Sequence, residues 1–206
     1  MPPTHSVRER AQGQSLAEFA LIVPLFFLVL MGLIEFAFAF NGMLNTNYAS
    51  RGAGLIAAQV GNSAAADCLI LNEVEDLMDA PAERSQVSRV EIQRTNPSGS
   101  TVYAASVYQR SGTTSCALTG GATISVPYSV VSAGYPPSQR CTVLPPSGCP
   151  TLLPVRTTVD TIAVQITYVY PWHTPLRSLM GMLGGSLSGT GYTFVQRNAF
   201  LMEPTL

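Results

Sequence analysis

Charged residues are scarce in this chain of 206 residues: only 11% are Asp, Glu, Lys or Arg, against a usual share of about a quarter. Lysine is absent, and 11 arginines nearly balance 12 acidic residues. Because these charges are spread along the chain, the sequence offers no basic patch for nucleic acid or an anionic membrane surface. Hydrophobic residues make up 47% of the chain, and the mean hydropathy is +0.25. This composition argues against disorder and against a soluble cytosolic enzyme, and it favours a membrane segment.

Histidine is rare as well, and beyond the first residues only His173 remains. It follows Trp172 and lies between two prolines, which indicates an aromatic turn rather than a general base. Ser186 does not have the Gly-x-Ser-x-Gly spacing of a nucleophile elbow, and no phosphate-binding loop is present. We therefore expect that the protein is not an enzyme and that it binds no metal and no cofactor. A membrane-tethered hydrolase that uses His173 is the alternative from another class.

One long apolar run dominates the chain. Phe19 to Ile34 contains no polar side chain, and after Glu35 the run continues to Phe40. These roughly 22 residues would form about 33 Å of helix, which matches the bilayer core. Pro24 is tolerable in a membrane helix. The sequence therefore predicts a transmembrane helix over residues 14–40.

The flanking charges predict how this helix is oriented. Arg8 and Arg10 precede the run, and the first basic residue after it is Arg51. The positive-inside rule then places the N-terminus in the cytoplasm and the rest of the chain outside. Two simpler interpretations stay open: an uncleaved signal anchor, and a secretory signal cleaved after Ala39, which would release a periplasmic binding domain.

The residues before the apolar run indicate a third interpretation of it. They read Gly13-Gln14-Ser15-Leu16-Ala17-Glu18-Phe19. The Glu18 carboxylate then lies at the membrane edge, where a charge is costly and its presence needs an explanation. If the chain is cut after Gly13, the new amine of Gln14 lies one helical turn from Glu18. In an assembly, the amine of one subunit could neutralise Glu18 of its neighbour within the membrane. Ser15 and Glu18 also fit a capping box at the start of the helix, and both interpretations of Glu18 can hold together.

This pattern resembles the cleavage site of prepilins of the tight-adherence (Tad, Flp) type, and more closely the N-terminus of TadE-like pseudopilins. The resemblance covers residues 13–55, where Pro24 and the Gly32-Leu33-Ile34-Glu35-Phe36 and Asn47-Tyr48-Ala49-Ser50-Arg51-Gly52-Ala53 segments also match. Near the C-terminus the resemblance is loose, at Tyr168-Val169-Tyr170-Pro171 and at Gly191 to Asn198. It is absent in the middle of the chain. It does not separate TadE-like from TadF-like or TadG-like proteins.

The resemblance implies a minor pilin or pseudopilin that takes part in assembly or priming of a type IV pilus. A prepilin peptidase would remove residues 1–13, with Gly13, Gln14, Glu18 and Phe19 as the processing site. Glu18, Pro24, Glu35 and Arg51 are then the candidate assembly residues. The implied partners are the peptidase, other pilins, the inner-membrane assembly platform and the membrane itself. On an ideal helix Glu35 lies about 260° round from Glu18, so it sits either at the outer interface or in a subunit contact.

The remaining residues predict an α+β fold, with a helical stalk and second helix over residues 41–80 and a small extracytoplasmic head over 81–206. Gly52 to Ala57 loosely matches a dinucleotide fingerprint, but a membrane helix precedes it where a strand is needed, so we expect a helix-packing face. Asp67 to Asp79 has amphipathic spacing, and its acidic residues are expected on a solvated face. Val87 to Arg94 and Thr101 to Gln109 predict an antiparallel hairpin. Further strands are expected at Thr123 to Val131, Thr157 to Tyr170 and Tyr192 to Asn198, and a short apolar helix is expected at Pro175 to Leu183.

All four cysteines lie on the predicted outer side, where disulfides persist. Three pairings are possible, and we favour Cys141 with Cys149 and Cys68 with Cys116. A zinc site is the alternative, but a spacing of eight between the close pair is too wide for a zinc knuckle.

Overall fold

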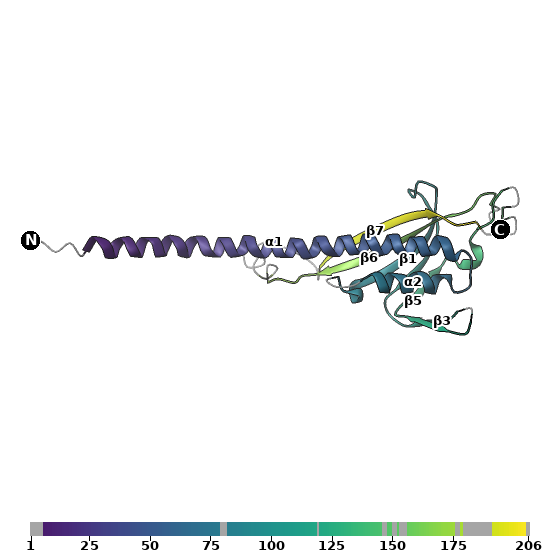
Figure 1. Cartoon of the computed structure of the whole chain (residues 1–206), viewed down its shortest axis with the longest axis horizontal. Helices are drawn as coiled ribbons and strands as arrows, with labels where there is room; N and C mark the ends of the chain where they lie inside the picture. Colours follow the sequence, from purple (N-terminus) through teal and green to yellow (C-terminus); the bar gives the residue numbers. More distant parts are fainter. Residues whose placement is uncertain are drawn as a thin grey trace, which may run out of the picture. The chain divides into compact units, whose positions relative to one another are not determined.

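The computed structural model describes residues 6–204 except 79–81, 119, 146–147, 150–151, 153–155, 176–177 and 179–190, with side chains from residue 16 onward. The chain divides into two compact units. The N-terminal unit comprises Met1–Ala39 and Trp172–Thr190, and the sheet unit comprises Phe40–Pro171 and Gly191–Leu206. Figure 1 shows the elements in chain order.

The first element is one continuous helix, α1, from Ser6 to Val60, with Pro24 inside it. Among the described residues, α1 is the one helix whose length and composition suffice to cross a membrane. It ends at Gly61, whose φ of +58° suits the left-handed residue that often closes a helix. Because α1 begins at Ser6, Ser15 lies inside the helix of the uncleaved chain, so the capping box expected at Ser15 and Glu18 is wrong there.

A five-stranded antiparallel sheet forms the centre of the sheet unit, with strand order β5-β2-β1-β6-β7. Its strands are β1 (Val87–Thr95), β2 (Val102–Gln109), β5 (Ser129–Ala133), β6 (Thr161–Pro171) and β7 (Gly191–Leu201). The α+β class and the expected hairpin are confirmed: β1 and β2 pair directly, and Gly99 in their turn has a φ of +71°.

The stretch expected as one strand over Thr123 to Val131 is two strands in different sheets. β4 (Thr123–Val126) pairs with β3 (Thr114–Ala117) in a separate two-stranded sheet, whereas β5 joins the main sheet. No pattern in the sequence indicates β3. Two short 3-10 helices, η1 (Arg84–Gln86) and η2 (Pro137–Gln139), complete the described elements. The short helix expected at Pro175 to Leu183 lies almost wholly outside the described residues.

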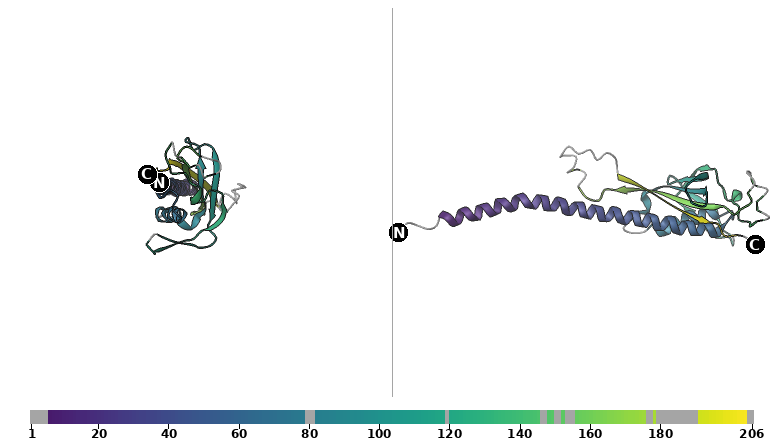
Figure 2. Two further views of the ribbon diagram at one scale, coloured as in Figure 1. Left: turned by 90° about the vertical axis from the view of Figure 1, so that its right-hand side faces the viewer. Right: turned by 90° about the horizontal axis from the view of Figure 1, so that it is seen from above.

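The part of α1 that belongs to the sheet unit, residues 40–60, and the helix α2 (Ala66–Leu77) lie along one face of the main sheet (Figure 2). Ala49, Ala53 and Ala57, spaced four residues apart, are fully buried, and Ser50 donates a hydrogen bond to the carbonyl of Val164 in β6 at 2.7 Å. A Cβ on Gly54 would come within 2.6 Å of the Phe200 ring in β7. The small-residue segment therefore packs closely on the main sheet of its own chain.

Both cysteine pairs lie at disulfide distance, in the pairing favoured from the sequence. Cys68 with Cys116 ties α2 to β3, and Cys141 with Cys149 closes a loop after η2. Closing these loops restricts the unfolded chain, which contributes about 2 to 4 kcal/mol per disulfide. The sheet unit is thus held together by cross-links as well as by its core.

Candidate assembly interface

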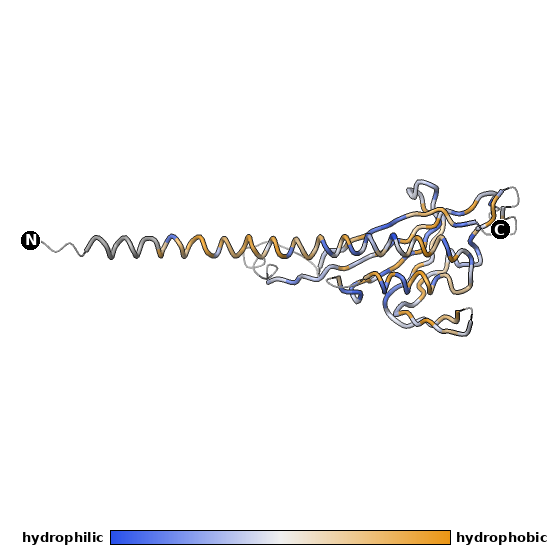
Figure 3. The backbone as a smooth tube through the Cα atoms, in the orientation of Figure 1, coloured by the Kyte–Doolittle hydropathy of each residue, from blue (hydrophilic) through white to orange (hydrophobic). Residues whose placement is uncertain are grey.

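A long row of large apolar side chains on α1 is exposed within the N-terminal unit. Figure 3 colours this part of the helix as mostly hydrophobic. The exposed fraction is 70% for Leu16, 66% for Phe19 and 79% for Leu21. The remaining large apolar side chains of this surface are Ile22, Leu25, Phe26, Phe27, Val29, Leu30, Leu33, Ile34, Phe36 and Phe38. Soluble proteins rarely expose apolar patches of more than a few hundred Å². This surface therefore requires lipid or other apolar helices around it.

The residues of the expected processing site lie on one stretch of this helix. Gly13 and Gln14 fall within the helical backbone of α1, and Glu18 and Phe19 are exposed on its surface. Arg51 is also exposed, but it belongs to the sheet unit. The chain by itself therefore presents Glu18 and Phe19 to their surroundings, as recognition by another protein would require.

Glu35 has a different environment from Glu18. It is only 5% exposed, and its carboxylate accepts hydrogen bonds from the backbone N–H groups of His173 at 3.1 Å and Thr174 at 2.8 Å. One turn further along α1, the Phe38 ring stacks on the His173 imidazole with centroids 5.1 Å apart. Hydrogen bonds to a carboxylate are stronger than neutral ones. Glu35 thus binds the segment of its own chain that follows β6.

This contact joins residues about 138 positions apart in the sequence. The only sequence signal was a carboxylate alone in an apolar run, which needs a partner in low dielectric. His173, considered above as a catalytic base, packs through its ring against Phe38, in keeping with the expected aromatic turn. Among the described residues, no group of three or more His, Cys, Asp or Glu side chains is placed to hold a metal ion.

Two acidic side chains of α2 bind tyrosine and arginine side chains from other parts of the sheet unit. Glu75 is 9% exposed and accepts hydrogen bonds from the Tyr128 hydroxyl at 2.6 Å and from the Arg110 guanidinium. Asp67 is bound in the same way by Tyr108 and Arg140. The expectation that the acidic residues of this helix form a solvated face is therefore wrong for Glu75. Amphipathic spacing cannot reveal it, because a buried carboxylate with two partners looks like a surface residue in the sequence.

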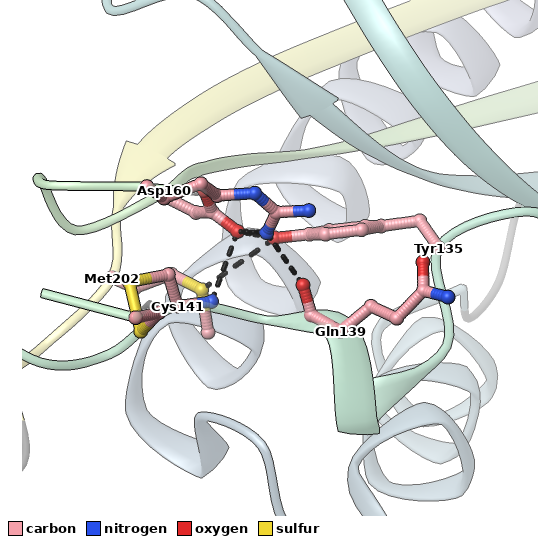
Figure 4. A network of polar contacts seen from close by, with 7 residues as sticks. Tyr135, Gln139, Cys141, Asp160 and Met202 are labelled. Carbon is pink, nitrogen blue, oxygen red and sulfur yellow. Dashed lines mark hydrogen bonds and ion pairs between the residues drawn. A yellow bond between two sulfur atoms is a disulfide. The ribbon is translucent and has the colours of Figure 1, made fainter. Parts of the chain in front are cut away.

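A third group with the same chemistry lies between loops of the sheet unit (Figure 4). The Asp160 carboxylate accepts hydrogen bonds from the Tyr135 hydroxyl at 2.7 Å, the Cys141 backbone N–H at 3.0 Å and the Arg156 guanidinium. Arg156 also donates to the carbonyl of Gln139. Asp160 thus fixes the loop that carries the Cys141–Cys149 disulfide next to the start of β6.

These contacts change the titration of the tyrosines. Burial raises the pKa of Tyr108, Tyr128 and Tyr135 above its ordinary value of 10.0, and the carboxylates of Asp67, Glu75 and Asp160 raise it further. A hydroxyl that donates to a carboxylate must keep its proton, so each group is stable only with neutral tyrosine. The three groups are structural, and they hold α2 and the loops against the sheet.

Comparison with known proteins finds one segment of the chain that is similar to a family. Residues 13–54 match the family model described as TadE-like protein. The match confirms the resemblance over those residues, which include Gly13, Glu18, Pro24, Glu35 and Arg51. It indicates a role associated with a Tad pilus, and an apolar N-terminal helix fits a single-pass membrane pilin. No curated protein and no solved structure matches the chain.

Proposed function

We propose, from the TadE-like segment at residues 13–54, that this protein is a minor pilin or pseudopilin that takes part in assembly or priming of a Tad (Flp) type IV pilus. The observation that carries the proposal is the exposed apolar surface of α1, which begins at Leu16, within the Gly13 to Phe19 pattern. In the bilayer this surface is covered by lipid, and during assembly by the helices of other pilins.

Processing is the first step of the proposed mechanism. A prepilin peptidase hydrolyses the peptide bond between Gly13 and Gln14 on the cytoplasmic side, which releases residues 1–13 and leaves a free amine on Gln14. The N-terminus of the precursor lies in the cytoplasm, and the sheet unit lies in the periplasm, where its disulfides persist. Glu18 then pairs with the Gln14 amine of a neighbouring subunit, because an ion pair is strong in low dielectric.

Glu35 has a separate part in this proposal. Because its carboxylate is already bound to the backbone of His173 and Thr174, it positions the segment after β6 rather than contacting another subunit directly. The assembly surface of α1 is therefore the apolar side chains together with Glu18 at their cytoplasmic end.

One experiment compares the wild type with Glu18→Ala in the native host, by intact mass, N-terminal sequencing and counting of pili. We expect wild-type protein from membranes to begin at Gln14. Glu18→Ala is expected to reduce pilus assembly at least tenfold, whereas Glu203→Ala, which removes an exposed carboxylate in the sheet unit, leaves it unchanged.

Other starting residues identify the alternatives. A wild-type start at Phe40 makes the apolar run a cleaved signal and the protein a released periplasmic domain. An intact Met1 leaves a simple signal anchor. Normal pilus assembly by Glu18→Ala removes the proposed role of this carboxylate.

A further inference from the structure

The turn from Trp172 to Pro175 follows β6 and belongs to the same compact unit as the apolar part of α1. Its backbone donates two hydrogen bonds to Glu35, and the His173 ring stacks on Phe38, one helical turn further along. Phe38 is 37% exposed, His173 is exposed and Trp172 is half-buried. The turn therefore presents aromatic side chains beside the far end of the apolar run.

The position of Glu35 along α1 corresponds to the far edge of a bilayer. At about 1.5 Å per residue, α1 rises about 26 Å from Glu18 to Glu35 and about 30 Å from Glu18 to Phe38. The hydrocarbon core of a bilayer is about 30 Å thick. With Glu18 at the cytoplasmic edge, Glu35 lies just inside the periplasmic edge, and the contact between Phe38 and His173 lies at that edge. This step rests on the proposed membrane span of α1.

The backbone of this turn suits a place with little water. An N–H group without an acceptor is costly near hydrocarbon, so irregular backbone is not exposed to lipid there. His173 and Thr174 donate their N–H groups to Glu35, at 3.1 and 2.8 Å. Pro171 and Pro175, on either side, have no backbone N–H group. Four of these five consecutive residues thus leave no N–H group that needs water.

We propose that this turn lies in the headgroup region of the periplasmic leaflet, where Trp172 and His173 contact lipid and Glu35 holds the turn at that depth. Tryptophan is enriched at membrane–water interfaces because its ring is apolar and its N–H group is polar. A lipid surface fits better than a protein partner, because the turn is continuous with the apolar surface of α1 and lies at the height of the headgroups. The turn then fixes how deeply α1 enters the bilayer, and with it the depth of Glu18 at the opposite edge.

The test uses the fluorescence of Trp172, which is the only tryptophan in the chain and so reports on the turn alone. The full-length protein is reconstituted into phosphatidylcholine vesicles, and flotation on a density gradient measures whether α1 is inserted. The acyl chains are brominated either near the headgroup or near the chain end, because bromine quenches a tryptophan that it contacts. We expect the label near the headgroup to quench about half of the emission and the label near the chain end to quench clearly less. Acrylamide in the water should quench Trp172 several-fold less than it quenches free tryptophan.

The outcomes separate this proposal from the proposed function. Emission that neither brominated lipid quenches, from protein that floats with the vesicles, overturns the proposal and leaves the membrane span of α1 intact. Stronger quenching by the label near the chain end also overturns it, because Trp172 then lies within the hydrocarbon. Protein that does not float contradicts the membrane span itself, so that the proposed function and this inference fail together.

A variant tests whether Glu35 holds the turn. Glu35→Ala removes the acceptor of both N–H groups, so quenching by the label near the headgroup should fall at least twofold and quenching by acrylamide should rise. Glu203→Ala removes an exposed carboxylate in the sheet unit and is the matched control, which should behave as the wild type. Equal quenching in the two variants would overturn the proposal, because the depth of Trp172 would not depend on Glu35.

Discussion

Three carboxylates decide most of the polar chemistry of the sheet unit, and each is bound by one tyrosine and one arginine. Asp67 and Glu75 lie on α2, whereas Asp160 precedes β6. A buried ion pair alone adds little stability, because both charges lose water. The tyrosine hydroxyl donates a further hydrogen bond to each carboxylate, which lowers the cost of burying its charge.

Glu35 in the N-terminal unit is likewise a buried carboxylate that accepts hydrogen bonds, here from two backbone N–H groups. We expect Glu35→Ala to release the segment at His173 and Thr174, because it removes both acceptors. Hydrogen bonds to a charged group contribute about 1.5 to 3 kcal/mol each, so amide exchange there should quicken at least tenfold. Hydrogen exchange with mass spectrometry of the full-length protein in micelles measures this. Glu18→Ala is the control, and unchanged exchange in Glu35→Ala would contradict the contact.

At the scale of elements, α1 serves two purposes with two compositions. Its first part carries large apolar side chains that are exposed, and its part within the sheet unit carries small residues that are buried. Ala49, Ala53 and Ala57 repeat every four residues, so they form one stripe of the helix. Their small size lets the helix axis approach the sheet closely, as the contact between Gly54 and Phe200 shows.

A matched pair of substitutions tests this division of α1. Gly54→Ala places a Cβ 2.6 Å from the Phe200 ring, whereas a Cβ at Gly32 meets no described atom within 4 Å. Alanine favours a helix over glycine by about 0.5 to 1 kcal/mol, but overpacking a core costs about 1 to 3 kcal/mol. We therefore expect Gly54→Ala to lower the free energy of unfolding of the sheet unit and Gly32→Ala to leave it unchanged, as measured by urea unfolding in micelles. Equal midpoints would show that α1 does not pack closely at Gly54.

For the whole molecule, the tyrosine groups set the pH range of stability. The pKa of Tyr108, Tyr128 and Tyr135 is raised in the folded protein, so the unfolded chain loses these protons first as the pH rises. Their contribution is fully present below pH 10.0, the ordinary tyrosine value, and is lost above it.

Urea unfolding between pH 8 and pH 11 measures this loss. At pH 11, one unit above the ordinary value, each of these tyrosines should lower the free energy of unfolding by about 1.4 kcal/mol. Tyr128→Phe removes one of the three and should show a smaller fall over the same range. A midpoint that does not change up to pH 11 would contradict burial of these hydroxyls.

Local patterns in the sequence suffice for the elements whose signals are local. The apolar run over residues 19–40 predicts a membrane-length helix, and alternation around Asn96 to Gly99 predicts the β1–β2 hairpin, because both depend on neighbours in the chain. The sequence pattern does not show that one strand ends at Val126 and another begins at Ser129. Which sheet each of these two strands joins depends on what it packs against. Likewise, no alternation of apolar and polar residues indicates β3.

The sequence by itself determined the TadE-like segment at residues 13–54, the apolar helix and the α+β class. Only the tertiary structure decided the partner of Glu35 and the burial of Glu75. The physical reason is the range of the contacts involved. Helical and strand periodicity act over a few residues, whereas the environment of a carboxylate or guanidinium is set by residues up to 139 positions away, which only the folded chain brings together.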